Sequence, residues 1–284
     1  MSIVLDPAVA SEPLKADSSS HTASPRLSPA QLQAWLQCPL SHHHRYVEGN
    51  VPRPSPSSFL GTVVRSALVY LHQAERDRVF PDVDDLDRYV LGNWHAWVER
   101  DCMESSSVPE ERALQRQACA LLAAYLDQRA PDEPPALAVA QRIAVPVIDA
   151  VTGEDLGVDL VGELDLVTDG PSGPVIVDFC TSSRSASPME VLQEVHLNCQ
   201  AYLYRYIAGC AEGGLETRRL VKTKTPHVQY QRWPARAVLH LRRLRAVIRT
   251  YLAAGQAGHV VYRPSLACSW CAYRDTVCRT WLAS

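Results

Sequence analysis

The order of hydrophobic patterns along this 284-residue chain predicts an α/β or α+β domain with a mixed central sheet and an early helical insertion. Helical periodicity dominates residues 58–130. Patterns typical of strands follow within 137–179 and 215–233, and helical segments come after each of these two regions. The composition, 46% hydrophobic and 21% charged, is that of an ordinary globular core.

The N-terminal residues predict a tail and then a capped helix. Residues 1–25 are rich in Ser, Ala and Pro without periodicity, so we expect a disordered tail, with residues 26–284 forming a single domain. Ser28 and Pro29 are typical of an N-cap and a first helical residue, which predicts a short helix over 29–37. Three prolines predict a loop over 51–58.

A helical part is predicted from residue 58 to residue 130, beginning with a helix over 58–78. Further helices are expected over 84–130. Apolar residues there recur at helical spacing, namely Leu114, Ala118, Leu121, Leu122 and Tyr125.

Strand patterns begin after this helical part. Residues 137–147 and 157–168 alternate between two faces, and in the second segment Glu163 and Asp165 share the face opposite Leu164. A tight turn is predicted at 170–173. The nearly continuous apolar run over 174–179 is typical of a buried strand.

The C-terminal third predicts a helix, two strands and a last helix. The helices are expected over 188–208 and 234–254, and the strands near 215–222 and 227–233. A last segment, 262–284, contains three closely spaced cysteines.

The charge is unevenly divided. Residues 1–179 carry 13 Lys and Arg against 26 Asp and Glu, and residues 180–284 carry 15 against 5. This asymmetry favours a polyanionic partner for the C-terminal part. Alternatively, the two halves neutralise each other across their interface.

Two carboxylates are predicted to meet on neighbouring strands. Asp165 and Asp178 lie on segments joined by a tight turn, and two such oxygen ligands suit a hard cation such as Mg²⁺ or Mn²⁺. Gln200 and Tyr204, four residues apart on one helical face, could orient water or a phosphate nearby. The alternative is that the two aspartates only terminate strands or make turns.

These residues resemble a known family. The series Gly162–Asp165, Asp178–Ser182 and Gln200–Tyr204 resembles the core of RecB-type PD-(D/E)XK nucleases, and Val221–Pro226 resembles the strand that follows there. The resemblance implies a restriction-endonuclease-like mixed sheet, a nuclease core over 137–254, DNA as partner and Mg²⁺ or Mn²⁺ as cofactor.

Two positions depart from the family pattern. The family's catalytic lysine is replaced by Cys180, and its metal-binding histidine by Arg65. A thiol is mostly neutral at pH 7 and cannot replace an ammonium, and a guanidinium has no lone pair for a metal. We therefore expect a DNA-binding protein with impaired catalysis. The alternative is an active metal-dependent exonuclease whose positive charge comes from Arg184, Lys222 or Lys224.

Four cysteines form a candidate metal centre. Cys268, Cys271 and Cys278 cluster near the C-terminus, and Cys38 lies far upstream. Four thiolates suit a [4Fe–4S] cluster or a structural zinc, and unligated cysteines are the third possibility. The one-plus-three arrangement resembles the iron–sulfur branch of the family, which includes CRISPR-adaptation and AddB-like nucleases. This favours a cluster that joins 262–284 to Cys38.

The expected partner is DNA, as single strands or duplex ends. Candidate phosphate contacts are Arg184, Lys222, Lys224, Arg242, Arg245 and Arg249. The arginines of 234–254 are equally compatible with a solvated helix face. The expected roles are DNA processing, repair or defence in the cytoplasm, without a membrane, and an ATP-driven motor such as a helicase is expected to be a separate chain.

Overall fold

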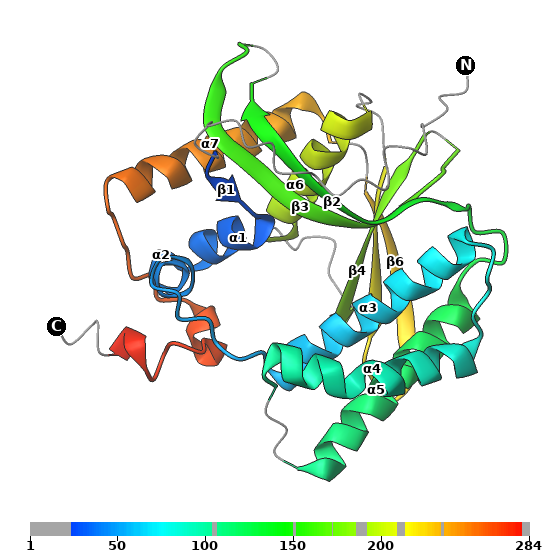
Figure 1. The fold of residues 1–284 in the computed structure, drawn as a ribbon. Helices are drawn as coiled ribbons and strands as arrows, with labels where there is room; N and C mark the ends of the chain where they lie inside the picture. Colours follow the sequence, from blue (N-terminus) through cyan, green and yellow to red (C-terminus); the bar gives the residue numbers. More distant parts are fainter. Residues whose placement is uncertain are drawn as a thin grey trace, which may run out of the picture.

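A mixed six-stranded sheet separates two groups of helices (Figure 1). The computed structural model describes residues 24–103, 107–149, 152–171, 173–185, 192–208, 214–233 and 236–279. The strands are β1 (Arg26–Leu27), β2 (Ala136–Ile148), β3 (Asp155–Thr168), β4 (Val175–Ser182), β5 (Gly214–Val221) and β6 (His227–Trp233). The longer helices are α1 (Pro29–Gln37), α3 (Pro56–Arg76), α4 (Val83–Asp101), α5 (Val108–Gln128), α6 (Leu192–Ala208) and α7 (Val238–Gln256).

The sheet combines parallel and antiparallel pairs in the order β1-β3-β4-β5-β6, with β2 also paired to β3. β3 runs antiparallel to β2 and β4, whereas β4 and β5 are parallel. A parallel pair needs a crossover, and α6 provides it. The predicted mixed sheet flanked by helices is therefore confirmed.

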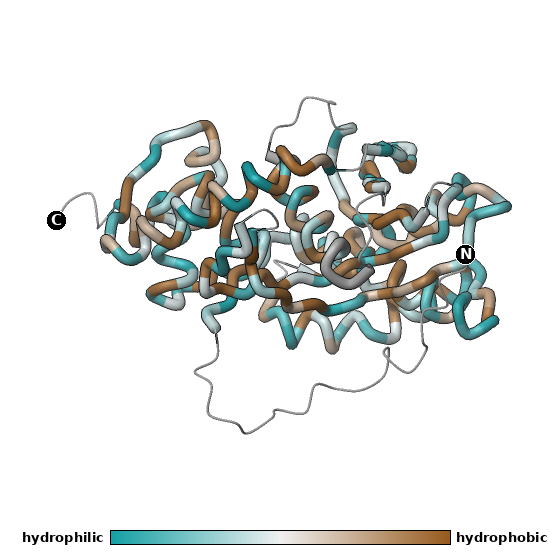
Figure 2. Tube along the Cα trace, turned by 90° about the horizontal axis from the view of Figure 1, so that it is seen from above, coloured by the Kyte–Doolittle hydropathy of each residue, from teal (hydrophilic) through white to brown (hydrophobic). Residues whose placement is uncertain are grey.

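Each face of the sheet packs on its own helices. The predicted helical part becomes α3, α4 and α5, which pack on one face in a cluster that includes Phe59, Leu68 and Phe179. On the other side, α6 packs with α1 and α7 around Leu160 and Leu203. Figure 2 shows hydrophobic residues mostly where these layers meet, as expected of amphipathic elements.

Most predicted boundaries agree with the structure within a few residues. The first helix spans 29–37 as predicted, because Ser28 forms a capping box with Gln31. The predicted 51–58 loop is wrong at its end, since α3 begins at Pro56, where Ser55 accepts a hydrogen bond from the Ser58 amide. β4 continues to Ser182 because its parallel pairing with β5 continues beyond residue 179.

Other differences concern segments with little hydrophobic pattern. The structure adds β1, which pairs in parallel with β3, and α2 (Pro39–His42), which continues into a π-helical turn, η2 (His43–Val47). The last helix begins at residue 238 instead of 234. The predicted disorder of the tail concerns mainly residues 1–23, which lie outside the described residues.

The chain's two ends pack against each other. The backbone amide of Leu40 donates to the carbonyl of Val261 over 3.2 Å, and the hydroxyl of Tyr273 donates to the carbonyl of Asn50 over 2.6 Å. A 3₁₀ helix, η3 (Leu266–Trp270), lies in this C-terminal segment. Within the described part of the chain, no helix is both long and apolar enough to cross a bilayer.

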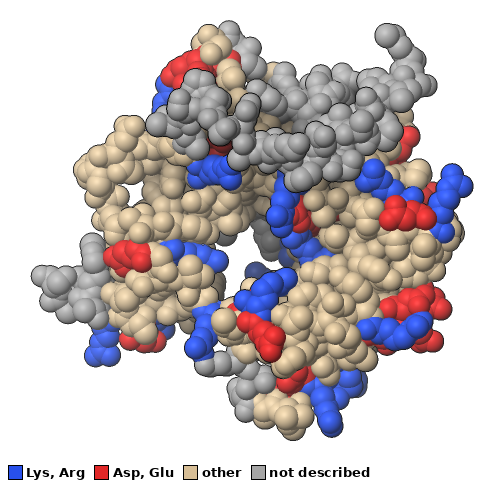
Figure 3. Space-filling view, in the orientation of Figure 1, with Lys and Arg blue, Asp and Glu red and all other residues tan. Residues whose placement is uncertain are grey.

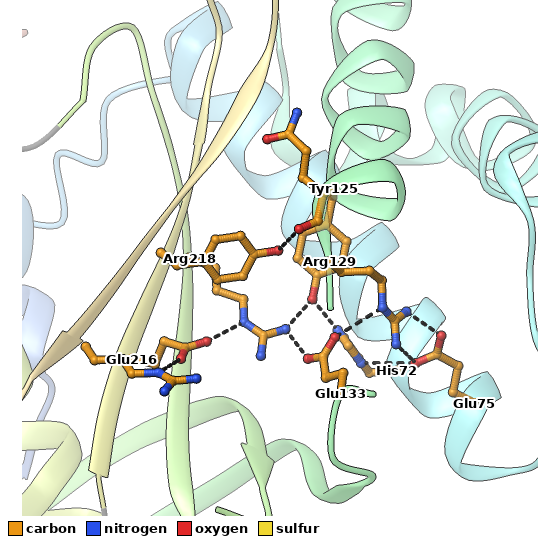
Figure 4. A network of polar contacts seen from close by, with 10 residues as sticks. His72, Glu75, Tyr125, Arg129, Glu133, Glu216 and Arg218 are labelled. Atoms are coloured by element: carbon orange, nitrogen blue, oxygen red, sulfur yellow. Dashed lines mark hydrogen bonds and ion pairs between the residues drawn. The ribbon is translucent and has the colours of Figure 1, made fainter. Parts of the chain in front are cut away.

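A polar network connects the helical part to the sheet (Figure 4). Arg218 of β5 forms ion pairs with Glu133 and Glu216, all three side chains being buried. The network continues through Arg129 to Glu75 on α3. Because buried charges need partners, this network fixes how the helices sit on the sheet.

Candidate active site

Asp165 and Asp178 lie where two strands diverge. The last antiparallel pair that joins β3 to β4 is Leu166 with Val177, so the two aspartates are the next residues on each strand beyond it. Their carboxylates are close enough to influence each other. Burial raises the pKa of Asp165 above its ordinary value, and repulsion from Asp178 adds to this rise.

Asp165 is buried, with 3% of the residue exposed, and both of its oxygens have partners. Its Oδ2 accepts a hydrogen bond of 2.9 Å from the backbone amide of Phe179. Its Oδ1 accepts a hydrogen bond of 2.6 Å from Nε of Arg65, which lies on α3. The same guanidinium donates through Nη2 to Glu163 over 3.0 Å, so one arginine joins two carboxylates of β3.

Asp178 is held from the opposite side by α6. Nε2 of His196 lies 2.9 Å from Oδ1 of Asp178. Burial alone would lower the pKa of His196, but the Asp178 carboxylate reverses this effect and the pKa is raised. His196 was not predicted as a site residue from the sequence. Its position four residues before Gln200, on the same helical face, was the available signal.

Gln200 and Tyr204 occupy different environments. The side-chain amide of Gln200 reaches the carbonyl of Glu163 and Nε2 of His196, over 3.5 and 3.4 Å, so it belongs to the carboxylate site. Tyr204 is buried in a hydrophobic cluster with Leu164. The structure therefore brings Gln200 into the polar part of the site, and the role of Tyr204 stays a prediction.

Close packing explains the glycine at position 162. A Cβ atom there would lie 2.5 Å from Cδ1 of Leu203, which is buried on α6. A similar approach occurs across the site, where a Cβ on Gly61 of α3 would lie 3.0 Å from the hydroxyl of Thr181 on β4. Both helices thus come close to the strands that carry the carboxylates.

Cys180 is half-buried on β4 and shares a face with Asp178 by strand alternation. Beyond it, Lys222 follows β5 beside the end of β4, where its amide donates to the carbonyl of Ser182 over 2.8 Å. The ammonium of Lys222 donates to the hydroxyl of Ser57 over 2.5 Å. A basic group therefore lies near the N-terminus of α3.

The remaining candidate phosphate contacts are scattered. Arg184 and Lys224 are exposed near the ends of β4 and β5, and Arg242 is exposed on α7. Arg245 pairs with Asp149 and Glu154, and Arg249 also pairs with Glu154. Figure 3 shows a hollow in this face, rimmed by Lys and Arg, between α1–α2 and α3–β4.

The comparisons with known proteins identify the superfamily. The family model described as the PD-(D/E)XK nuclease superfamily matches residues 26–279, nearly the whole chain. The chain belongs to the PD-(D/E)XK nuclease superfamily. No curated protein matches this superfamily member in sequence.

Solved structures resemble this PD-(D/E)XK protein only distantly. A predicted exonuclease from Eubacterium rectale is 11% identical with a TM-score of 0.47, and the match covers 87% of this chain and 93% of that one. A protein named SSO0001 is 10% identical with a TM-score of 0.39, and the match covers 90% and 88% of the two chains.

The carboxylate site does not fit the divalent metal that PD-(D/E)XK nucleases usually use. Asp165 already binds Arg65 and the Phe179 amide, and Asp178 binds His196. In the described ranges, no group of three or more His, Cys, Asp or Glu residues is arranged to hold a metal ion. The guanidinium at position 65 also repels a cation.

The four cysteines of the candidate metal centre line one cavity. Cys38, Cys268, Cys271 and Cys278 all border a space of about 540 Å³ between α2, η2 and the C-terminal segment. Burial raises the pKa of Cys278, and the neighbouring Cys271, Cys38 and Cys268 raise it further. Among the residues that the structure describes, these thiols share a cavity but are not arranged as a ligand set for a metal ion, so a bound group there stays a prediction.

Proposed function

We propose that this protein is a RecB-type member of the superfamily that binds DNA in its processing, repair or defence, with little or no phosphodiester hydrolysis of its own. The proposal rests on the site geometry. The two carboxylates meet where β3 and β4 diverge, but β4 carries Cys180 where the family has lysine.

Cys180 is the observation that carries this proposal. A positive charge beside the scissile phosphate stabilises the transition state, and losing one such preorganised group typically costs on the order of 10²–10³ in rate. A thiol with an ordinary pKa of about 8.5 is mostly neutral at pH 7 and supplies no such charge. Binding of the DNA phosphate backbone does not need a positive charge at position 180, because other Lys and Arg side chains can contact the phosphates.

A second candidate function is an active exonuclease in which Lys222 supplies the missing charge. Its backbone is hydrogen-bonded to Ser182 at the end of β4, and its ammonium contacts Ser57 of α3. The contact of the Lys222 ammonium with Ser57 of α3 favours it over the other candidates, Arg184 and Lys224. Under this alternative, Lys222→Ala and Asp178→Ala would both abolish cleavage.

DNA binding is tested by fluorescence anisotropy with labelled single-stranded and duplex DNA. We expect binding in EDTA that weakens steeply as salt rises, because phosphate contacts release counterions. Replacing Lys222, Lys224 and Arg184 by Glu should weaken binding to all sequences. A protein with no affinity for either DNA at low salt would refute the proposed function.

We further propose that Cys38, Cys268, Cys271 and Cys278 hold a [4Fe–4S] cluster. The shared cavity supports this assignment, because four thiolates are a complete ligand set for such a cluster. Bound there, it would attach 262–284 to Cys38 and stabilise 26–284 as one domain. Anaerobically purified protein should be brown and contain about four iron atoms per chain. Stoichiometric zinc in colourless protein would refute the cluster.

A further inference from the structure

The surroundings of Arg65 indicate a cation supplied by the protein itself. Its guanidinium donates to Asp165 and to Glu163. Both carboxylates come from β3, and the arginine comes from α3, a contact between residues 100 positions apart. A bound divalent ion would form similar bridges between carboxylates.

The charges of the site are nearly balanced by side chains. Asp165, Asp178 and Glu163 contribute three carboxylates. Arg65 and Arg142 contribute two guanidiniums, since Arg142 also pairs with Glu163 over 2.9 Å. In contrast to an acidic pair without counter-ions, this arrangement provides little net attraction for Mg²⁺ or Mn²⁺.

Arg65 also remains accessible from the solvent side. Asp165 is only 3% exposed, whereas 39% of the Arg65 side chain is exposed. The planar fork of arginine carries five N–H donors and can therefore bind carboxylates on one side and a phosphate on the other. A purely structural ion pair would not need this accessible edge.

We propose that Arg65 takes the place of the divalent cation in this site, bridging Asp165 and Glu163 and offering its remaining N–H groups to a phosphate of the bound nucleic acid. DNA binding at this site is then independent of divalent metal. The phosphate contact rests on the proposed function, whereas the replacement of the cation does not.

The replacement of the cation is tested by calorimetric titration with Mn²⁺. The wild-type protein should show no binding that depends on Asp165. Arg65→His removes the permanent charge and adds a ligand, so it should create an Mn²⁺ site at least about tenfold tighter than any in the wild type. The site should disappear in the double variant Arg65→His with Asp165→Asn.

The folding of the variants is controlled separately. Arg65→Ala would leave Asp165 buried without its partner and could unfold the chain. Arg65→Gln keeps hydrogen-bond donors and is therefore the variant used to remove the charge. Arg88 forms an exposed ion pair with Asp85 within α4, and Arg88→Ala is the control for loss of a surface arginine. Circular dichroism establishes that each variant is folded.

The phosphate contact is tested by DNA binding in EDTA and in Mn²⁺. Wild-type affinity should be equal in both, Arg65→Gln should weaken it about tenfold in EDTA, and Arg88→Ala should not change it. Wild-type Mn²⁺ binding lost in Asp165→Asn, or an Arg65→His variant without a new site, would overturn the replacement of the cation. Unchanged affinity in folded Arg65→Gln would overturn the phosphate contact. If the wild type bound no DNA, the proposed function and the phosphate contact would both fail. The Mn²⁺ titration would still decide whether Arg65 replaces the divalent cation.

Discussion

At the scale of single residues, the site is determined by what surrounds two carboxylates. Asp165 is buried against Arg65 and a backbone amide, whereas Asp178 is held by His196. Removing Arg65 or His196 leaves a carboxylate without its side-chain partner, which is costly in a poorly hydrated environment. The ion pairs therefore stabilise the fold as well as shaping the site.

Gly162 provides a residue-scale test of the packing beside these carboxylates. Gly162→Ala should lower the free energy of unfolding by about 1–3 kcal/mol, because its Cβ would overlap Cδ1 of Leu203 and the buried leucine has little room to move. Urea denaturation measures the change. Gly92→Ala on α4 is the control, since apart from its own helix backbone and chain neighbours no atom lies within 4 Å of a Cβ there. Equal stability of Gly162→Ala and wild type would contradict the packing.

Glu75 determines part of the response to acid. Burial raises its pKa, but hydrogen bonds from His72 and Arg129 outweigh burial and lower the pKa from 4.5 to about 2. Below pH 4.5 the unfolded chain therefore binds a proton at Glu75 that the folded chain does not. The stabilisation is present above pH 4.5 and is lost as pH falls toward about 2.

Glu75→Gln should therefore flatten the dependence of stability on pH between about 4.5 and 2. Urea denaturation at several pH values measures this slope. Glu99→Gln, at an exposed pair with His95, is the control and should keep the wild-type slope. An unchanged slope in Glu75→Gln would show that the network does not lower the pKa of Glu75.

The sequence predicted some of these residues and missed others for physical reasons. Asp165 and Asp178 could be paired because a short turn joins their strands, which forces them to be neighbours. The contacts of Arg65 could not be predicted, since they depend on how α3 docks on the sheet. The ion pairs of Arg245 could not be predicted either, because its acidic partners lie about ninety positions away in the sequence.

At the scale of elements, buried charges orient the helical part on the sheet. Arg218 of β5 contacts Tyr125 of α5 and Glu133, which follows α5. The aromatic ring of Phe179, next to Asp178, stacks on His72 of α3 with centroids 5.6 Å apart. The same helix carries Arg65, so the docking of α3 on the sheet also places Arg65 beside Asp165.

Arg218→Met should destabilise the fold by about 3–5 kcal/mol, because Glu133 and Glu216 would lose their buried partner. Adding Glu133→Gln should recover part of this loss, which makes the two changes non-additive. Thermal and urea unfolding of the single and double variants test the coupling. Strictly additive effects would contradict a shared network.

Elements were predicted well where hydrophobic periodicity is long and poorly where it is short. The 14-residue β3 has clear alternation, and its predicted extent was nearly correct. In contrast, β1 has two residues and exists only through its pairing with β3. The π-helical turn after Cys38 likewise has no periodic signature.

At the scale of the whole molecule, part of the charge asymmetry is internal. Arg245 and Arg249 of the basic C-terminal part pair with Glu154 of the acidic part, and Arg218 pairs with Glu133. These contacts agree with the alternative in which the halves neutralise each other. Arg184, Lys222 and Lys224, near the ends of β4 and β5, are therefore our preferred DNA contacts rather than the arginines of α7.

The central claim is that the site retains the carboxylates of a nuclease but lacks the groups needed for hydrolysis. The most direct measurement is the rate of cleavage of labelled DNA in Mg²⁺ or Mn²⁺ by wild type, Asp178→Ala, and the double variant Cys180→Lys with Arg65→His. We expect wild type to equal Asp178→Ala, and the double variant to cleave faster by on the order of 10²-fold or more. Rapid wild-type cleavage that Asp178→Ala abolishes would contradict the account.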